Sequence, residues 1–496
     1  MKLRKTKWLT GFLILTLAVL LTACSEKEQT ELDAKDETKT EQVDTVALKN
    51  NITLSVPRGF IGDTVDFNVS ELVANQDAEL VWNAIDGEYV IEDLYAVVGP
   101  EFTEREIVIA TGKADANGKW SGQFTVPEGF GGDFTVWVKQ DGEKIGQVAY
   151  TVDPKFVMEP ESGPVGTEIK IKVEGLGWST YMRNWQLTYD NKYTGLITAI
   201  STNGTAEAKI RAAGEVGKHA IRIRTGYLGM QYINYKQSPY PDKPAPDFLF
   251  EITEGASNNL ANHVEEVPVA AGGGLEMPAL KNQKDVTASL SIDEGIVGEP
   301  VTLTAAGLPA NTEIDLVWNT MRGSRVSGKG FGGESSVLTT VKTDANGAVN
   351  YDFIVPDDLG GIPHRIDLAI DEDIYAQTYL RILPSIVEFS PKSGPVGTVV
   401  TVTIKGGGWT EYDNAYYLNY DNAYTGYLCA FNSNGDLTFD FVATGHVGHH
   451  VVDLYPGIYK QEELSTDMTL IPQLTYSTDH PGSAMPAIRL SFEVTE

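Results

Sequence analysis

Apolar and polar positions alternate over short stretches along most of the chain. Successive side chains of a β-strand point to opposite faces, so strict alternation predicts a half-buried strand. Examples are F-T-V-W-V at 134–138, I-K-I-K-V at 169–173, A-I-R-I-R at 220–224 and T-V-T-I at 401–404. Beyond the N-terminal region we find no long stretch with the 3.6-residue period of an amphipathic helix. The pattern therefore predicts an all-β chain.

Turn residues separate these predicted strands. D-A-N-G occurs at 115–118 and 344–347, and N-G occurs at 203–204 and 434–435. Asn, Asp and Gly tolerate the positive φ angles that tight hairpins need. The strands recur about every 8–12 residues, which is typical of an immunoglobulin-like β-sandwich.

An internal repeat sets the predicted domain organisation. A shift of 231 residues places 160–226 on 391–457 without a gap, with 27 identities in 67 positions. A weaker similarity joins the segments before these two, because the sequence LVWN at 80–83 recurs at 316–319. The repeat therefore predicts two similar pairs of modules, in the order A–B–linker–A′–B′. The expected boundaries are 52–153 for A, 154–253 for B, 254–286 for the linker, 287–384 for A′ and 385–496 for B′.

The N-terminus has the pattern of an export signal. Four basic residues precede an apolar run at 8–21, which is short for a membrane span and ends in L-T-A-C at 21–24. This order resembles the lipobox of bacterial lipoproteins, which implies cleavage after residue 23 and lipid on the sulfur and amine of Cys24. An uncleaved anchor would give the same topology. Residues 25–51 are polar and charged, so we expect a disordered tether that holds extracytoplasmic modules to the membrane.

Composition excludes some partners. The formal net charge is −30, with 38 Lys and Arg against 68 Asp and Glu. Phosphate binding needs clustered basic residues, so we expect no nucleic-acid partner. The same charge argues against adhesion of the folded part to anionic lipid.

The strongest repeated motifs carry a family resemblance. S-G-P-V-G-T (162–167 and 393–398) precedes an alternating strand and then G-x-G-W (175–178 and 406–409). This order resembles the opening of IPT/TIG domains, and the resemblance implies immunoglobulin-like sandwiches for B and B′. A and A′ resemble the family only loosely. Because such domains occur in proteins of many functions, the resemblance does not give a ligand.

Aromatic residues cluster in matching stretches of B and B′. An exposed row of rings would stack on sugars or form a protein-binding hot spot, whereas core packing would bury the same rings. Trp178, Trp409, Tyr189 and Tyr420 are expected in cores. The tentative ligand-binding residues are Tyr181, Trp185, Tyr193, Tyr412, Tyr416 and Tyr424.

Other candidate chemistry has a simpler explanation. H-V-G-H-H at 446–450 has the ligand types of a zinc or copper site, but neighbouring strand residues face opposite ways, and His219 shares the position of His450. Cys429 lies in an alternating run and is expected to pack as a small apolar residue. G-K-G-F-G-G at 328–333 precedes a strand rather than a helix, so it is not a dinucleotide site. We therefore expect no metal, no cofactor and no catalytic residue.

The sequence thus predicts a lipid-anchored surface protein with a non-catalytic binding or adhesion role toward a glycan or a surface protein. Two alternatives stay open. One is a structural spacer that holds something away from the membrane. The other is an accessory protein of an extracellular enzyme or metal system.

Overall fold

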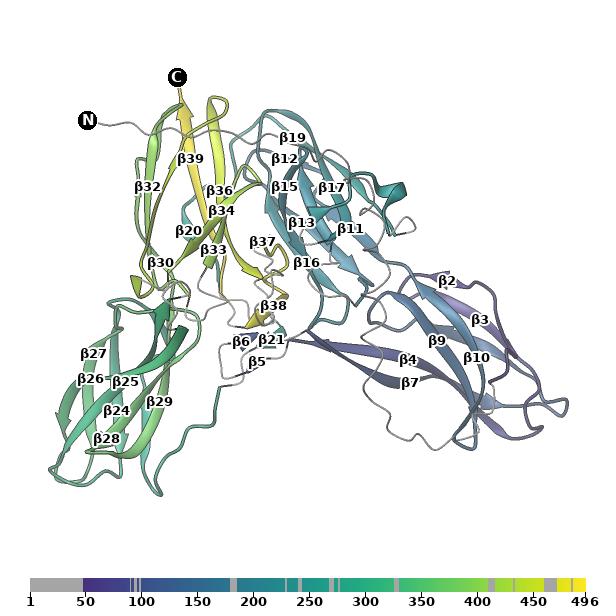
Figure 1. The fold of residues 1–496 in the computed structure, drawn as a ribbon, viewed down its shortest axis with the longest axis horizontal. Coiled ribbons are helices and arrows are strands. Elements are labelled where there is room, and N and C mark those ends of the chain that lie inside the picture. Colours follow the sequence, from purple (N-terminus) through teal and green to yellow (C-terminus); the bar gives the residue numbers. More distant parts are fainter. Residues whose placement is uncertain are drawn as a thin grey trace, which may run out of the picture. The chain divides into compact units, whose positions relative to one another are not determined.

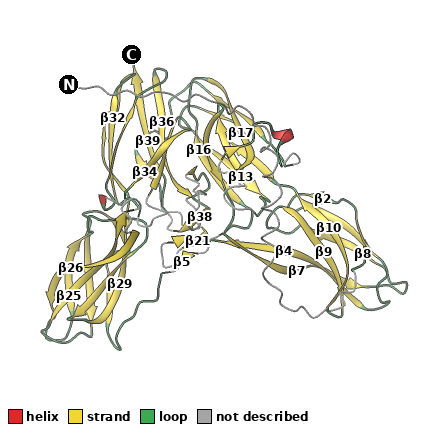
Figure 2. Ribbon diagram, viewed as in Figure 1, coloured by secondary structure: helices red, strands yellow, loops and turns green. Residues whose placement is uncertain are grey.

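The computed structural model describes residues 48–89, 91–92, 96–97, 100–178, 185–227, 230–239, 243–266, 272–274, 277–324, 330–408, 415–430, 433–458, 471–482 and 485–496. Regular structure in these ranges is almost entirely strand (Figures 1 and 2). All of it beyond Leu48 belongs to one compact unit, Lys49–Glu496. The expected signal peptide, Cys24 and most of the tether lie outside the described residues.

Module A contains a three-stranded and a five-stranded sheet. Their strand orders are β1-β3-β8 and β2-β10-β9-β4-β7, and a separate hairpin joins β5 to β6. The strands are β1 (Ile52–Leu54), β2 (Arg58–Gly59), β3 (Thr64–Val69), β4 (Asp77–Glu88), β5 (Ile91–Glu92), β6 (Ala96–Val97), β7 (Glu101–Lys113), β8 (Trp120–Thr125), β9 (Gly132–Gln140) and β10 (Glu143–Val152).

Module B repeats this arrangement. Its sheets run β11-β13-β16 and β12-β19-β17-β14-β15, with β18 paired to β17. The elements are β11 (Lys155–Glu159), β12 (Ser162–Gly163), β13 (Glu168–Glu174), β14 (Trp185–Tyr189), β15 (Lys192–Ile197), β16 (Ala206–Arg211), β17 (Gly217–Tyr227), β18 (Met230–Gln231), the 3-10 turn η2 (Tyr235–Gln237) and β19 (Asp247–Ile252).

Module A′ has the same two sheets as A. Their orders are β22-β24-β27 and β23-β29-β28-β25-β26. The strands are β22 (Thr287–Leu290), β23 (Glu294–Ile296), β24 (Pro300–Ala306), β25 (Glu313–Ser324), β26 (Gly330–Lys342), β27 (Val349–Ile354), β28 (His364–Ile370) and β29 (Asp373–Leu383).

Module B′ has sheets β30-β32-β35 and β20-β39-β36-β33-β34, with β31 paired to β39 and β37 paired to β36. The strands are β30 (Ser385–Ser390), β31 (Ser393–Pro395), β32 (Val399–Lys405), β33 (Ala415–Tyr420), β34 (Ala423–Cys429), β35 (Leu437–Val442), β36 (Gly448–Ile458), β37 (Ile471–Pro472), β38 (Asp479–Gly482) and β39 (Ile488–Thr495). The chain therefore forms tandem immunoglobulin-like sandwiches, as the alternation predicted.

Each module has its own apolar core between its two sheets. The alternation seen in the sequence matches burial along the strands. In β13, for example, Ile169, Ile171 and Val173 are fully buried, while the intervening lysines lie closer to solvent. Burial of such a side chain stabilises the fold by about 1.5–3 kcal/mol relative to leaving it exposed. The expected strands at 134–138, 220–224 and 401–404 are confirmed in the same way.

The segment at 254–286 is more than a linker. Its strand β20 (His263–Val264) pairs with β39 and becomes an edge strand of B′. Its strand β21 (Gly272–Gly274) pairs with β38. Upstream, the amide of Asn258 donates to the carbonyl of Val165 in B at 2.8 Å. The sequence showed little periodicity here because only a few residues at a time contact a neighbouring strand.

The expectation for Cys429 was half right. The residue lies in strand β34, as predicted, but its thiol side chain is exposed. The reason is topological, since β34 is the last strand of its sheet and every residue along it is at least partly accessible.

Candidate functional site

The repeated glycine motifs form the joint between an A module and a B module. The amide of Gly131 in A donates to the carbonyl of Leu176 in B at 2.9 Å, and the amide of Leu176 donates to Gly204 at 3.0 Å. A Cβ at position 131 would lie 1.8 Å from the carbonyl oxygen of Gly175. Only glycine allows two backbones to approach this closely.

The second copy builds the same joint from the matching residues. The amide of Gly360 donates to Gly407 at 2.6 Å, and the amide of Gly407 donates to Gly435 at 2.8 Å. A Cβ at position 360 would lie 2.0 Å from the carbonyl oxygen of Gly406. The repeated G-x-G and N-G motifs therefore connect neighbouring modules by backbone contacts.

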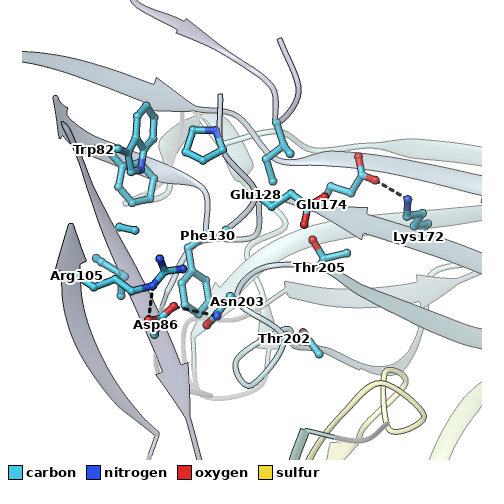
Figure 3. A pocket seen from close by; sticks show the side chains of 16 residues that line it. Trp82, Asp86, Arg105, Glu128, Phe130, Lys172, Glu174, Thr202, Asn203 and Thr205 are labelled. Carbon is cyan, nitrogen blue, oxygen red and sulfur yellow. Dashed lines mark hydrogen bonds and ion pairs between the residues drawn. The ribbon is translucent and has the colours of Figure 1, made fainter. Parts of the chain in front are cut away.

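An open cleft lies beside the first joint (Figure 3). Its volume is about 370 Å³, and both A and B contribute to its walls. The side chains of Trp82, Phe130 and Phe134 form its apolar part and are themselves almost fully buried. Smaller apolar residues and a glycine extend this part, namely Ile61, Ala84, Ile85, Pro127 and Gly129. The polar and charged part of the lining consists of Asp86, Arg105, Glu128, Lys172, Glu174, Thr202, Asn203 and Thr205.

The polar side of the cleft is held by cross-module contacts. Asp86 pairs with Nε of Arg105 at 2.5 Å and accepts a hydrogen bond from Nδ2 of Asn203 at 3.1 Å (Figure 3). The Asn203 side-chain oxygen accepts from the amide of Gly87 at 2.8 Å. The Thr202 hydroxyl is buried against the cleft and has no hydrogen-bond partner. The site thus offers donors, acceptors and one unsatisfied hydroxyl to a small polar ligand.

In the second copy an ion pair occupies the matching position. Counting from the LVWN repeat, Arg322 stands where A has Asp86. The dipeptide Val-Pro also recurs, at 126–127 and 355–356, and counting from it Asp358 stands where A has Gly129. Nη1 of Arg322 lies 2.8 Å from Oδ1 of Asp358, and Trp318 donates to Oδ2 of the same carboxylate at 2.9 Å.

This carboxylate is ionised in the fold. Burial raises the pKa of Asp358, but hydrogen bonds from Arg322, Trp318 and the Leu359 amide outweigh that effect and lower it below its usual 3.8. The two joints share a backbone, but the described residues of the second present the Arg322–Asp358 ion pair where the first presents Asp86 and Gly129.

Two of the residues predicted to bind ligand are core residues instead. Trp185 is 5% exposed and packs on Phe156, with ring centroids 5.0 Å apart. Tyr416 is fully buried, and its hydroxyl donates to the carbonyl of Pro486 at 2.9 Å. Their strands β14 and β33 each lie between two others in the sheet, so one face must meet the core and the other is covered as well. They cannot form an exposed row.

The other four candidates divide into two groups. Tyr193 and Tyr424 occupy equivalent positions and contact each other across the B–B′ interface, with ring centroids 6.5 Å apart. Burial raises the pKa of both hydroxyls. Tyr181 and Tyr412 lie outside the described residues.

The two expected core tyrosines share one repeated contact. Tyr189 donates to the carbonyl of Ala213, and Tyr420 donates to the matching Thr444, each at 2.8 Å. Trp178 lies instead at the joint and packs against Phe134 of A. Trp409, also expected in a core, lies outside the described residues.

A buried charge network connects B to B′. The guanidinium of Arg211 in B lies 2.5 Å from Oδ1 of Asp453 in B′, and both side chains are 1% exposed. Arg489 lies 3.2 Å from the other oxygen of Asp453 and 2.7 Å from Glu265 of the linker segment. The alternation pattern did not reveal this network, because each residue occupies an ordinary polar position in its own strand.

Residues 471–479 of B′ form a second connection, which we call the strap. The Leu474 side chain is fully buried in the core of B. Asp479 accepts hydrogen bonds from the hydroxyl of Thr198 at 2.5 Å, the amide of Ile200 at 2.9 Å and Tyr89 of module A at 3.0 Å. Sequence reasoning missed the strap because the gapless repeat ends at residue 457. The first copy has a matching hairpin, since β18 pairs with β17 at Gly226 where β37 pairs with β36 at Gly457, but Ile233 is then exposed where Leu474 is buried.

The histidines have a structural role in both copies. Nδ1 of His450 lies 2.5 Å from Asp421, and Nε2 lies 2.9 Å from the carbonyl of His446. His219 makes the same two contacts, to Asp190 and Glu215. This repetition confirms that His450 occupies a shared fold position. Over the described ranges, no three His, Cys, Asp or Glu side chains gather in the manner of a metal site.

The described part of the chain contains no helix with the length and apolar character needed to cross a bilayer. Its fold and joints define a protein of four immunoglobulin-like sandwiches in two A–B pairs, with an open cleft at the first pair. No protein-family model and no curated protein matches the sequence.

Solved structures resemble the chain only distantly. A mutant of Salmonella alpha-2-macroglobulin matches at 10% identity over 88% of this chain and 30% of that one, with a TM-score of 0.19. This chain therefore spans less than a third of the length of the macroglobulin. A putative membrane anchored protein from Corynebacterium diphtheriae matches at 10% identity over 67% of this chain and 91% of that one, with a TM-score of 0.17. An ICAM-5 D1-D4 ectodomain fragment matches at 12% identity over 90% of this chain and 99% of that one, with a TM-score of 0.15.

Proposed function

We propose that this chain is a lipid-anchored extracytoplasmic protein that binds a glycan without catalysis, in the cleft between A and B. The anchoring part rests on the L-T-A-C sequence that ends at Cys24 and on the polar tether after it. The binding part rests on the cleft.

The observation that carries the proposal is the difference between the two joints. Both use the same glycine contacts, yet the first has a cleft of about 370 Å³, whereas the described residues of the second place the Arg322–Asp358 ion pair at the matching positions. A joint that served only as a connector would gain from the filled arrangement. The open joint is therefore the part of the duplicated frame that is suited to a ligand.

The lining indicates the class of ligand. Carboxylates, an arginine, an asparagine amide and threonine hydroxyls surround an apolar wall, and both signs of charge are present. Such a site suits a neutral, hydroxyl-rich molecule that needs many donors and acceptors and one apolar contact. A sugar residue of a cell-wall or other polysaccharide fits this description.

The test is retention of the soluble ectodomain, residues 25–496, on purified insoluble polysaccharides, with and without Ca²⁺. We expect saturable retention that Arg105→Ala weakens at least about tenfold, since it removes a charge-assisted donor from the cleft. Arg222→Ala is the matched control, because it also removes a surface arginine–carboxylate pair but lies outside the cleft. No retention on any polysaccharide, or equal loss in both variants, would refute glycan binding in this cleft.

The anchor has its own test. Cys24→Ser removes the thiol that would carry lipid, so the protein should move from the membrane fraction to the soluble fraction. A variant that stays with membranes would contradict lipid attachment at this residue.

A spacer is the second candidate function, and the contacts between modules favour it. Both joints are tied by backbone hydrogen bonds, and B and B′ share a buried ion-pair network. A chain that holds something at a fixed distance needs such connections. Absence of retention on every polysaccharide would move the assignment to this spacer function.

A further inference from the structure

The B′ sandwich has an open side where its two sheets end. Strand β34 is the edge of one sheet and β35 is the edge of the other. Between them lies a groove of about 530 Å³, separate from the cleft at the A–B joint. Apolar and aromatic side chains dominate its lining, including Tyr420, Tyr427, Leu428, Phe439, Phe441 and Val442.

In module B the equivalent opening, between β15 and β16, is filled by the strap. The amide of Leu474 donates to the carbonyl of Leu196 on β15 at 2.8 Å. The amide of Lys209 on β16 donates to the carbonyl of Leu474 at 3.1 Å. One extended residue thus bridges the two edge strands, and its aliphatic side chain is buried in the core of B.

Among the described residues, none occupies the same positions of B′ in this way. The 231-residue shift places Tyr427 at the position of Leu196 and Gly426 at that of Gly195. Leu196 is fully buried, whereas Tyr427 is 49% exposed. A Cβ at Gly195 would meet the Leu474 side chain at 2.8 Å, whereas a Cβ at Gly426 would meet nothing within 4 Å.

We propose that the β34–β35 groove of B′ binds an extended peptide strand of a partner protein, in the way that B binds its strap. A branched aliphatic side chain would lie against Tyr427 and Phe441. The strand would hydrogen-bond to the Tyr427 carbonyl and the Asp440 amide, the groups that correspond to those of Leu196 and Lys209. Addition of a strand to an exposed sheet edge gains affinity from backbone hydrogen bonds and specificity from side-chain pockets.

The alternative occupant is a B module of a second copy. In B′ the outer face of β33 and β36 covers the open edge of B, through Asn419 and Asp453. The matching face of B is partly covered by its own chain, since Arg224 donates to the carbonyl of Pro246 at 3.0 Å and Thr188 is 2% exposed. Arg222 also stands where B′ has Asp453, so this face lacks the carboxylate of the B–B′ contact and is the less suitable occupant.

The probe is a fluorescein-labelled peptide with the strap sequence, residues 471–479, and the readout is fluorescence anisotropy with the ectodomain 25–496. We expect saturable binding. Gly426→Val should weaken it at least about tenfold, because the added methyl groups enter the groove where the structure leaves open space. Tyr427→Ala should weaken it as well.

Two controls accompany these variants. Val447→Ala shortens another exposed valine of B′ that does not line the groove, and should leave binding unchanged. A peptide in which Leu474 is replaced by Asp should not bind, since the buried aliphatic side chain is lost. Equal melting temperatures would show that Gly426→Val and the parent are equally folded, and hydrogen exchange should locate new protection in 423–442.

Three results would overturn the proposal. One is the absence of saturable binding. Another is peptide binding that is equally strong in Gly426→Val. In that case the peptide would bind in B, where it would replace the strap, and not in the groove of B′. The last is loss of polysaccharide retention in Gly426→Val without peptide binding, which would make the groove a glycan site. The first two outcomes leave the cleft proposal untouched, because the variants that test the cleft lie in another module pair. The third outcome would also move glycan binding from the cleft to this groove.

Discussion

At the scale of single residues, duplicated side-chain contacts stabilise the two B modules. His450 is 0% exposed, stacks on Tyr420 and lies between two oxygen acceptors. Burial lowers the pKa of its imidazole, but the hydrogen bond and charge of Asp421 outweigh this effect, and the pKa is raised above 6.5. The folded protein therefore favours the protonated ring more than the unfolded chain does.

The raised pKa predicts a direction of pH dependence. The stabilisation from His450 is fully present below the unfolded pKa near 6.5 and is lost as pH rises through the higher folded value. The urea midpoint of the parent ectodomain should therefore fall between pH 6 and pH 9 by more than that of His450→Gln. Identical pH profiles for the two proteins would contradict the charged, Asp421-paired histidine.

The exposed thiol gives a second residue-scale prediction. Residues 25–496 contain one cysteine, Cys429, and its side chain is exposed at an edge strand. Ellman's reagent should titrate one thiol per ectodomain without denaturant, since accessible thiols react as thiolates. If the thiol reacts only after addition of guanidinium, β34 is covered in solution. Cys429→Ser serves as the blank.

At the scale of elements, short segments outside the regular strands determine how the modules connect. The strap closes the open edge of B with Leu474, and Asp479 accepts hydrogen bonds from both A and B. In B the residue after the matching hairpin, Ile233, is exposed rather than buried in a neighbouring core. An element of the last module thus completes the core of the second.

This arrangement predicts the effect of emptying the strap pocket. Leu474→Ala removes a fully buried side chain from the core of B and should reduce the free energy of unfolding of that module by about 2–5 kcal/mol. Val447→Ala, an exposed truncation in B′, should change it by less than about 0.5 kcal/mol. Chemical denaturation measures both. Equal, small effects would mean that the strap does not stabilise B.

At the scale of the whole molecule, B and B′ share a buried network of charges. Asp453 forms ion pairs with Arg211 of B and Arg489 of B′, and all three side chains are at most 2% exposed. A buried ion pair contributes little net stability, but the loss of one member leaves a charge uncompensated in a dry site.

We therefore predict that Asp453→Ala is among the most destabilising single changes at this interface. It leaves two buried guanidinium groups short of a carboxylate and should cost about 3–5 kcal/mol of unfolding free energy. Glu294→Ala removes a half-exposed carboxylate 3.9 Å from Arg381 and should cost less than about 1 kcal/mol. Urea denaturation decides between them. A change below about 1 kcal/mol for Asp453→Ala would show that the B–B′ contact is not formed in solution.

Much of the fold was predictable from local pattern. Strand positions follow from alternation, because a half-buried strand must place its apolar residues on one face. The order of the modules follows from the 231-residue repeat. The site was less predictable: Trp185 and Tyr416 looked like candidates for an exposed row, yet both are buried, because a sequence does not state whether a strand is central or at an edge.

The all-β class and the duplicated A–B order follow from the chain alone, and lipidation at Cys24 stays a prediction from it. These inferences depend on residues close together in the chain or on copies of one motif. Three features emerge from the three-dimensional packing instead: G-x-G and N-G connect modules, the first joint has a cleft, and the strap lies in B. Each depends on residues far apart in sequence, such as Leu196 and Leu474, whose meeting is set by how whole sheets pack.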